Sequence, residues 1–321
     1  MAYTKEEFKQ LVDDIQGQSW YRNPIGFGIA KVDRGQINKD KILQATFPLI
    51  NWNENFGSAA VLLNALKVAG ENVDTSKSEL VAKISDEFLT SCIEAFRPFI
   101  PEAKGDAHKN VQVISTLASL PIDSGLSADD YRVVFIFEDV APESTEAVYL
   151  KLYALSTGKA ALRSLNLTGA FGKLHNCAWV GNQPIELDWL RANEIVLKLS
   201  GKYPTIDMVD KFPRFLQHII PADNTRILET SKVRMGAQLA AGTTVMPGAA
   251  YVNFNAGTLG SVMVEGRISS SAVVGAGSDV GGGASILGVL SGTDGVPVTI
   301  GENTLLGANS CTGTAIGDGC I

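Results

Sequence analysis

A six-residue spacing of apolar residues constrains the C-terminal third of this chain more than any other feature. Ile227, Val233, Leu239, Val245 and Tyr251 follow one another at this interval. After a break the spacing resumes at Ile268, Val274, Val280 and Ile286. An α-helix repeats its buried face about every 3.6 residues and a strand about every 2, so neither explains the period. A six-residue repeat with small residues in between is typical of a parallel β-helix, which we predict over 221–321.

The first 220 residues lack this spacing and predict a mixed α/β domain, so we expect two domains. Residues 4–7 (TKEE) form a capping box, in which the threonine hydroxyl and a glutamate carboxylate bind free amides at a helix start. The run 132–137 is rich in β-branched and aromatic residues, as strands are. Further helices are expected over 56–66, 80–96, 142–155 and 188–199, and a further strand over 26–32.

Composition and charge exclude several classes of function. A net charge of -7 argues against nucleic acid as a partner, because binding phosphates needs a basic surface. No apolar run reaches the roughly 20 residues of a membrane-spanning helix, and the polar N-terminus is not a signal peptide. The cysteines are scattered, so we expect free, buried thiols in a cytoplasmic protein: Cys92, Cys177, Cys311 and Cys320.

The six-residue spacing is interrupted twice. It slips between Tyr251 and Val262, and it is lost from Gly288 to Thr299. Interruptions in a solenoid become loops on one face, and loops carry function more often than coils do. The sequence stops at Ile321 within a repeat, so we expect a further C-terminal segment to close the solenoid.

Histidine is absent from 219–321, which restricts the chemistry available to the repeat. It excludes a histidine-base acyltransferase and a three-histidine zinc enzyme, unless the N-terminal domain contributes. His108, His175 and His218 precede the repeat and are too far apart to predict a metal site. Glu265 stands out among the carboxylates because it lies where the spacing is disturbed. Partly shielded there, it could act as a general base, or it could simply form an ion pair with Arg267.

Three neighbouring features could bind ligands. Arg267 could hold a carboxylate or a phosphate through two hydrogen bonds. Asn253 and Asn255, if they occupy alternating strand positions, point the same way and form either an asparagine ladder or a polar substrate site. The stretch 281–285 (GGGAS) leaves a groove almost without side chains. A pantetheine arm could lie there, although a tightly turned coil explains the glycines equally well.

The tract from Ser231 to about Ser310 resembles the tetrahydrodipicolinate N-succinyltransferase family of lysine and diaminopimelate biosynthesis. The resemblance rests on VMVEGRISSSAVVGAGSDVGGGASILGVLSG and LLGANS. Residues 209–214 (VDKFPR) and 149–153 (YLKLY) are similar to the longer form of the enzyme, and the N-terminal hundred or so residues to its epsilonproteobacterial type.

The resemblance implies a left-handed parallel β-helix in a homotrimer, with active sites between neighbouring subunits. It implies succinyl transfer from succinyl-CoA, the co-substrate, to the amine of ring-opened tetrahydrodipicolinate, 2-amino-6-oxopimelate. Glu265 matches the family's catalytic carboxylate, which is described as a general base or as the carrier of an acyl-anhydride intermediate. Positions that contact succinyl-CoA are matched by Arg267, Gly282, Ser285 and Ala308.

Some relatives bind magnesium on the trimer axis through an aspartate and a glutamate. Ser231 stands at the first of these positions, and 246–250 (MPGAA) holds no acid, so we predict no metal. Two alternatives to the succinyltransferase remain open from the residues. One is a tetrahydrodipicolinate acetyltransferase or another CoA-dependent transferase on the same scaffold. The other is a trimeric scaffold without catalysis.

Overall fold

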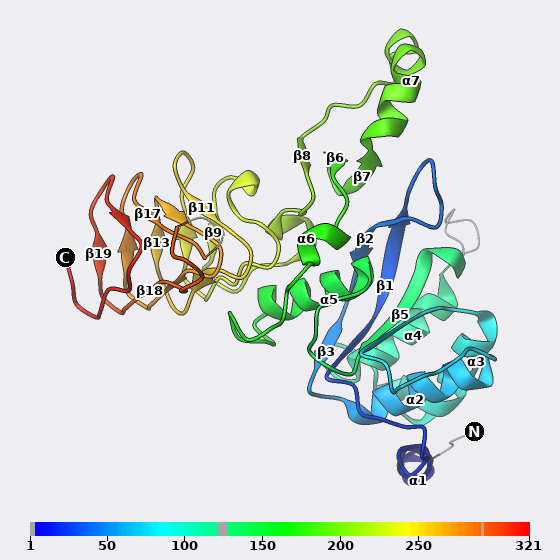
Figure 1. The fold of residues 1–321 in the computed structure, drawn as a ribbon. Helices are drawn as coiled ribbons and strands as arrows, with labels where there is room; N and C mark the ends of the chain where they lie inside the picture. The colour runs from blue at the N-terminus through cyan, green and yellow to red at the C-terminus, as the bar shows by residue number, and fades with distance from the viewer. Residues whose placement is uncertain (1–3, 121–127, 290–291) are drawn as a thin grey trace. The chain divides into compact units, whose positions relative to one another are not determined.

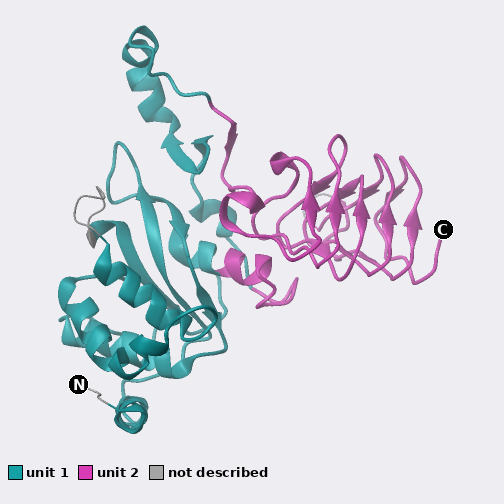
Figure 2. Ribbon diagram, turned by 180° about the vertical axis from the view of Figure 1, so that it is seen from behind, with its two compact units in different colours: residues 1–150, 166–205 teal, residues 151–165, 206–321 magenta. Residues whose placement is uncertain are grey.

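The computed structural model describes residues 4–120, 128–289 and 292–321. It divides into two compact units (Figure 2). Unit 1 comprises 1–150 and 166–205, and unit 2 comprises 151–165 and 206–321. The sequence predicts one cut near residue 220, whereas the units interleave and 206–220 belongs with the coils.

Unit 1 is built on an antiparallel sheet whose central strand is β1 (Gly26–Arg34). Its neighbours pair along the order β2-β1-β5-β4, and β3 also pairs with β1. These strands are β2 (Ile42–Thr46), β3 (Ile50–Trp52), β4 (Glu79–Lys83) and β5 (Tyr131–Ile136). A separate hairpin joins β6 (Cys177–Val180) to β7 (Gln183–Glu186).

Helices cover one face of this sheet, as Figure 1 shows for α2, α3 and α4. Their buried side chains and those of alternate β1 and β5 residues, including Phe27, Ile29, Val133 and Phe135, form one core. The helices of unit 1 are α1 (Lys5–Gln16), α2 (Phe56–Val68), α3 (Asp86–Phe96), η1 (Arg97–Glu102), α4 (Lys109–Ser119), η3 (Ala128–Asp130), α6 (Ala170–Lys173) and α7 (Leu187–Leu199). Helix α5 (Thr145–Ser156) begins in unit 1 and ends in unit 2.

Most of the predicted elements of the N-terminal half are confirmed, and one is wrong. The capping box at the start of α1 is present, with Thr4 accepting from the Glu7 amide. The helix predicted over 80–96 begins only at Asp86, where Ser85 caps it by accepting from the amide of Phe88. Its first part is strand β4, because Leu80 and its neighbours hydrogen-bond to the buried strand β5. That tertiary pairing overrides local helix propensity.

Unit 2 is a left-handed parallel β-helix with three sheets, and its coils stack side by side in Figure 1. One sheet has the order β19-β16-β13-β10-β9, the second β11-β14-β17-β20 and the third β12-β15-β18. The short helices α8 (Phe215–His218) and η4 (Thr230–Lys232) precede and interrupt the first coil. The strands are β9 (Arg226–Ile227), β10 (Thr244–Val245), β11 (Tyr251–Val252), β12 (Gly257–Thr258), β13 (Met263–Val264), β14 (Arg267–Ile268), β15 (Val273–Val274), β16 (Asp279–Val280), β17 (Ser285–Ile286), β18 (Thr299–Ile300), β19 (Leu305–Leu306) and β20 (Cys311–Thr312). Strand β8 (Met208–Asp210) belongs to the segment that leads into this unit.

The predicted six-residue spacing matches the inward column with one exception. Val245, Val264 and Val280 pair in register and are fully buried. Tyr251 was expected to point inward, and this is wrong. Val252 is the buried residue that pairs with Ile268, whereas Tyr251 lies on the outer side of the strand. Successive side chains of a strand alternate between faces, so one position of slip exchanges the inner and outer residues.

Two of the four thiols differ from the prediction of buried cysteines. Cys92 and Cys177 are buried, and burial raises the pKa of Cys177 to about 11. Cys311 and Cys320 are exposed on the last coil. Within the described residues no helix is long and apolar enough to cross a membrane.

His218, at the end of α8, packs half-buried against α5 within unit 2. Its Nδ1 lies 2.8 Å from the Tyr153 hydroxyl, and the two rings meet edge to face. Loss of solvent lowers the pKa of His218 to about 3, so the imidazole stays neutral in the folded protein.

Replacing His218 tests whether its burial limits stability in acid. The unfolded chain protonates this histidine below its ordinary pKa of 6.5, whereas the folded chain does so only near a pKa of about 3. The contribution is therefore complete above pH 6.5 and is lost as the pH falls from there toward 3. Urea unfolding should show a weaker loss of stability in acid for His218→Gln. Tyr153→Phe keeps the imidazole buried and should retain the full loss, and identical pH profiles for both variants would contradict the account.

Candidate functional site

The coil edge at Glu265 is shorter than the edges above and below it. Two residues, Glu265 and Gly266, join β13 to β14. The corner above spans 281–284 and the corner below spans 246–250. This short corner and the longer corner 246–250 together account for the change of phase between Val245 and Ile268. The chain crosses this edge by a shorter path than the corner above, which contains Gly282 and Gly283.

Gly266 is required by the packing of this corner. A Cβ atom there would lie 2.4 Å from the carbonyl oxygen of Ala284 and 2.8 Å from that of Gly281. Backbone atoms cannot move aside as a flexible side chain can, so a larger residue would push the coils apart.

The Glu265 side chain extends toward the glycines of the coil above. Its amide donates to the Val280 carbonyl at 2.9 Å, which fixes the height of the residue along the helix axis. A Cβ atom on Gly282 would lie 3.6 Å from Glu265 Oε2, an ordinary contact, and would meet nothing else within 4 Å. Coil packing therefore does not require glycine at 282, in contrast to 266. The missing side chain leaves the approach to the carboxylate open.

Arg267 pairs with Ser285 and not with Glu265. Its Nε and Nη2 both donate to Ser285 Oγ, at 3.1 and 2.6 Å. No ion pair joins Glu265 and Arg267, and Glu265 forms no side-chain hydrogen bond with the rest of the described chain. The alternative of an ion pair between Glu265 and Arg267 requires both residues to lie on one strand. Glu265 instead occupies the corner, so the two side chains diverge.

Four predicted site residues therefore lie close together, and Ala308 extends the same edge. Ala308 follows β19, and its amide nitrogen would lie 2.9 Å from a Cβ atom on Gly281. The site edge, defined as Glu265, Gly282 and Ala308, thus runs across successive coils. Arg267 and Ser285 lie beside it on the outer face of the sheet that contains β14 and β17.

Asn253 and Asn255 do not occupy alternating strand positions. Strand β11 ends at Val252, and Asn255 has a left-handed φ of 54° at the next corner. Its Oδ1 accepts from the amide of Arg163 at 2.8 Å, and its Nδ2 donates to Ser271 Oγ at 3.4 Å. Tyr251 pairs with Arg267, so Asn253 lies toward the opposite end of the sheet from Glu265.

The orientation of the Asn253 amide is fixed by its neighbours. Its Oδ1 accepts from Arg234 Nη1 at 3.3 Å and from the Phe254 amide at 2.9 Å. Both partners are donors only, so the oxygen must face them. The Nδ2 group consequently points away, and it has no acceptor among the described residues. It is available to a ligand.

An arginine cluster behind Asn253 was not predicted as part of the site. Arg234 donates to both carboxylate oxygens of Asp210, and Arg214 donates to Asp210 Oδ2 at 3.1 Å. Burial raises the pKa of Tyr251, while the positive charge of Arg234 acts in the opposite direction. The mixed charge of residues 209–214 is the sequence signal for this cluster, but it does not show which side chains meet.

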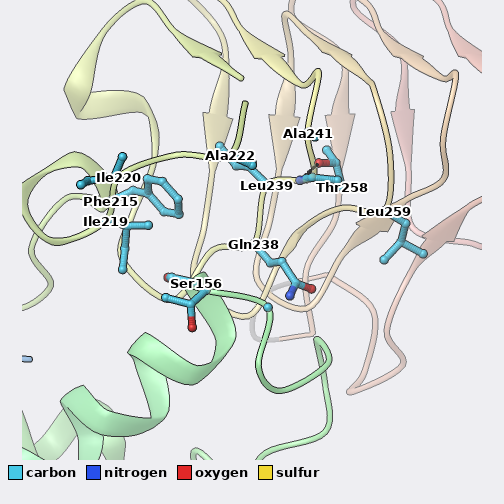
Figure 3. A pocket seen from close by; sticks show the side chains of 13 residues that line it. Ser156, Phe215, Ile219, Ile220, Ala222, Gln238, Leu239, Ala241, Thr258 and Leu259 are labelled. Atoms are coloured by element: carbon cyan, nitrogen blue, oxygen red, sulfur yellow. Dashed lines mark hydrogen bonds between the residues drawn. The ribbon is translucent and has the colours of Figure 1, made fainter. Parts of the chain in front are cut away.

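The described cavity of unit 2 lies away from the site edge. It has a volume of about 440 Å³ and is shown in Figure 3. Its walls include Phe215, Ile219, Gln238 and Leu259, from α8 and the first coils. None of the predicted site residues lines it.

The hydroxyl of Ser231, at a position where some relatives bind magnesium, is engaged within the chain. Ser231 donates its hydroxyl to Glu229 Oε1 at 2.5 Å. Among the described residues no group of three or more histidine, cysteine, aspartate or glutamate side chains could hold a metal. A serine hydroxyl and the acid-free stretch 246–250 do not supply the carboxylates that a magnesium ion prefers, so no step is assigned to a metal.

Comparisons with known families place most of the chain in one group. Residues 6–172 match the family described as "Tetrahydrodipicolinate N-succinyltransferase N-terminal" and residues 174–214 the one described as "Tetrahydrodipicolinate N-succinyltransferase middle". Residues 297–321 match "Hexapeptide repeat of succinyl-transferase".

Several named relatives are similar over nearly the whole chain. The 2,3,4,5-tetrahydropyridine-2,6-dicarboxylate N-succinyltransferase of Sulfurovum sp. is 70% identical over 98% of this chain and 79% of its own length. The enzyme of that name from Campylobacter jejuni is 58% identical over 100% of this chain and 81% of its own. A crystal structure from Campylobacter jejuni that carries a tetrahydropyridine-carboxylate N-succinyltransferase name has a TM-score of 0.91 and 57% identity. It covers 97% of this chain and 80% of its own.

Two nearby glycines give a matched test of the corner geometry. Gly266→Ala should lower the free energy of unfolding by about 1–3 kcal/mol, because the methyl group meets backbone carbonyls. Gly282→Ala should change it by less than about 0.5 kcal/mol, because its methyl group makes only an ordinary contact. Urea unfolding of the two variants measures the difference. Equal losses would show that the short corner is not packed as described.

Proposed function

The chain belongs to the tetrahydrodipicolinate N-succinyltransferase family, and we propose that Glu265 is the general base of its succinyl transfer. The acyl donor is succinyl-CoA, and the acceptor is the amine of 2-amino-6-oxopimelate, the ring-opened form of tetrahydrodipicolinate. The observation that carries the proposal is the position of Glu265. It is a carboxylate without a protein partner among the described residues, beside a glycine that coil packing does not require.

The reaction needs a proton acceptor at the amine. The amine nitrogen attacks the thioester carbonyl, so a C–N bond forms and the C–S bond breaks. Glu265 takes a proton from the nitrogen, and the departing thiolate of coenzyme A gains one. General-base assistance of this kind contributes about 10²–10⁴-fold to a rate. An ion pair with Arg267 would occupy the carboxylate, and the hydrogen bonds from Arg267 to Ser285 leave it free.

Arg267 is suited to hold the distal carboxylate of the succinyl group. Two of its nitrogens are fixed on Ser285 Oγ, which orients the planar guanidinium before a ligand binds. Its Nη1 remains to donate to an anion. An acetyl group has no such carboxylate. Gly282 and Ala308 lie along the same edge, where backbone without bulky side chains can accept the pantetheine arm.

The acceptor has two carboxylates that need donors. The free Nδ2 group of Asn253 supplies one, and Arg234 and Asp210 hold it in place. Asn255 contributes indirectly, because its side chain holds the neighbouring corner through hydrogen bonds with Arg163 and Ser271. Because Asn253 and Glu265 lie toward opposite ends of one sheet, a single chain does not bring them together. We place the active site between subunits of a homotrimer, where Asn253 and Glu265 of different copies can face one substrate.

We propose that the reaction takes place in a reducing compartment. The four cysteines are free thiols, which fits a cytoplasmic enzyme. Because the net charge is acidic and the substrates are small molecules, the proposed reaction involves neither nucleic acid nor a membrane.

Replacing Glu265 tests the proposed base. Glu265→Gln keeps the size of the side chain but cannot accept a proton, so kcat should fall by about 10²–10⁴-fold. The free energy of unfolding should hardly change, because the carboxylate has no partner to lose. The rate is measured as coenzyme A release from succinyl-CoA in the presence of 2-amino-6-oxopimelate.

The matched control is Glu302→Gln, which changes an exposed carboxylate at a corner near the end of the coil stack. It should keep nearly full turnover. Turnover of Glu265→Gln close to that of the unaltered protein would rule out the base. A succinylated Glu265 trapped by mass spectrometry would instead assign it the anhydride role.

A further inference from the structure

Unit 1 contains a cavity of about 530 Å³ between its sheet and helix α4. On the sheet side, Thr46, Lys31 and Tyr131 lie directly opposite one another on β2, β1 and β5. On the helix side, one face of α4 borders the cavity through Lys109, Gln112, Val113, Thr116 and Leu117. These residues recur at helical spacing, so the cavity is bounded by one regular helix face and one row of the sheet.

The walls of the cavity are mostly apolar, and several of their side chains are not fully buried in the core. Val113, Leu117 and Tyr131 are only partly buried where they pack on the core, and Ile29 closes the floor. Pro48 and Leu49 form the remaining side. A cavity of this size lies within the range of about 300–1,000 Å³ that binds small molecules, and apolar walls favour an apolar body.

Two lysines give the cavity a positive rim. The described residues that line the cavity include Lys31 and Lys109 but no carboxylate. Lys109 Nζ lies 3.2 Å from Asp106, whose side chain is fully exposed, and such a pair contributes little. Lys31 pairs with Oδ1 of Asp33, and Gln44 Nε2 donates to the other oxygen, Oδ2, at 2.6 Å. Lys109 can therefore turn toward an anion in the cavity, and Lys31 adds a second positive charge at the rim.

We propose that this cavity is a second ligand site, for a small carboxylate with an apolar body. The hydrocarbon part lies against Val113, Leu117 and Leu49, and the carboxylate binds Lys109 at the rim, where Lys31 adds a second positive charge. The site is separate from succinyl transfer, because all of its residues belong to unit 1 and the site edge belongs to unit 2.

Binding of decanoate to the whole protein tests this site. Isothermal titration calorimetry should show saturable binding of decanoate below its micelle concentration. The uncharged analogue decanol should bind at least about tenfold more weakly, a difference of about 1.4 kcal/mol. The double variant Lys31→Gln/Lys109→Gln should weaken decanoate at least about tenfold and leave decanol unchanged, because only the ionic contact is lost. Lys104→Gln, an exposed lysine outside the cavity, is the matched control and should bind as the unaltered protein does.

A second variant shows whether binding takes place in the cavity. Leu117→Glu places a carboxylate against the apolar walls and should abolish decanoate binding, with a thermal unfolding scan to verify that the variant folds. Absence of decanoate binding to the unaltered protein would overturn the proposal. It would also fail if Leu117→Glu binds normally, or if decanoate and decanol bind alike and the lysine variants change neither. Succinyl transfer does not enter any of these measurements, so they are independent of the role of Glu265.

Discussion

Backbone hydrogen bonds between successive coils fix the height of Glu265 and its neighbours in unit 2, and the site depends on them. The amide of Glu265 is bound to Val280, that of Met246 to Val264, and that of Arg267 to Ala284. These bonds hold Glu265 between two longer corners while β13 and β14 remain in register. A shorter connection could have shifted a strand. Here it shortens an edge instead, and the carboxylate lies close to Gly282 of the coil above.

Glycine has two distinct roles along this edge. Gly266 is imposed by packing, since carbonyl oxygens of the next coil occupy the space of a side chain. Gly282 is not imposed by packing, since a Cβ atom there would make only an ordinary contact with Glu265. The sequence shows both residues only as glycines in a glycine-rich tract. Contacts between coils are needed to separate a structural glycine from one that leaves room for a ligand.

The repeat could be predicted from the sequence because its spacing is a local signal, and the same spacing singles out Glu265, whose role stays a prediction. The sequence did not predict features that depend on partners distant in the chain. The local pattern of strand β4 predicts the start of a helix, because its pairing with β5 is not visible locally. The spacing predicts that Tyr251 points inward, because a period of six does not state which of two adjacent residues does so. The cluster of Asp210, Arg214 and Arg234 was missed for the same reason, since these residues meet only when the chain folds onto its first coil.

The central claim is that Glu265 acts as a base and does not itself carry the succinyl group. Rapid-quench measurement of coenzyme A release from succinyl-CoA, with and without 2-amino-6-oxopimelate, tests it most directly. A general base predicts no release until the acceptor amine is present, and then coenzyme A and N-succinyl product in equal amounts. A burst of coenzyme A equal to the number of active sites in the absence of acceptor would contradict it.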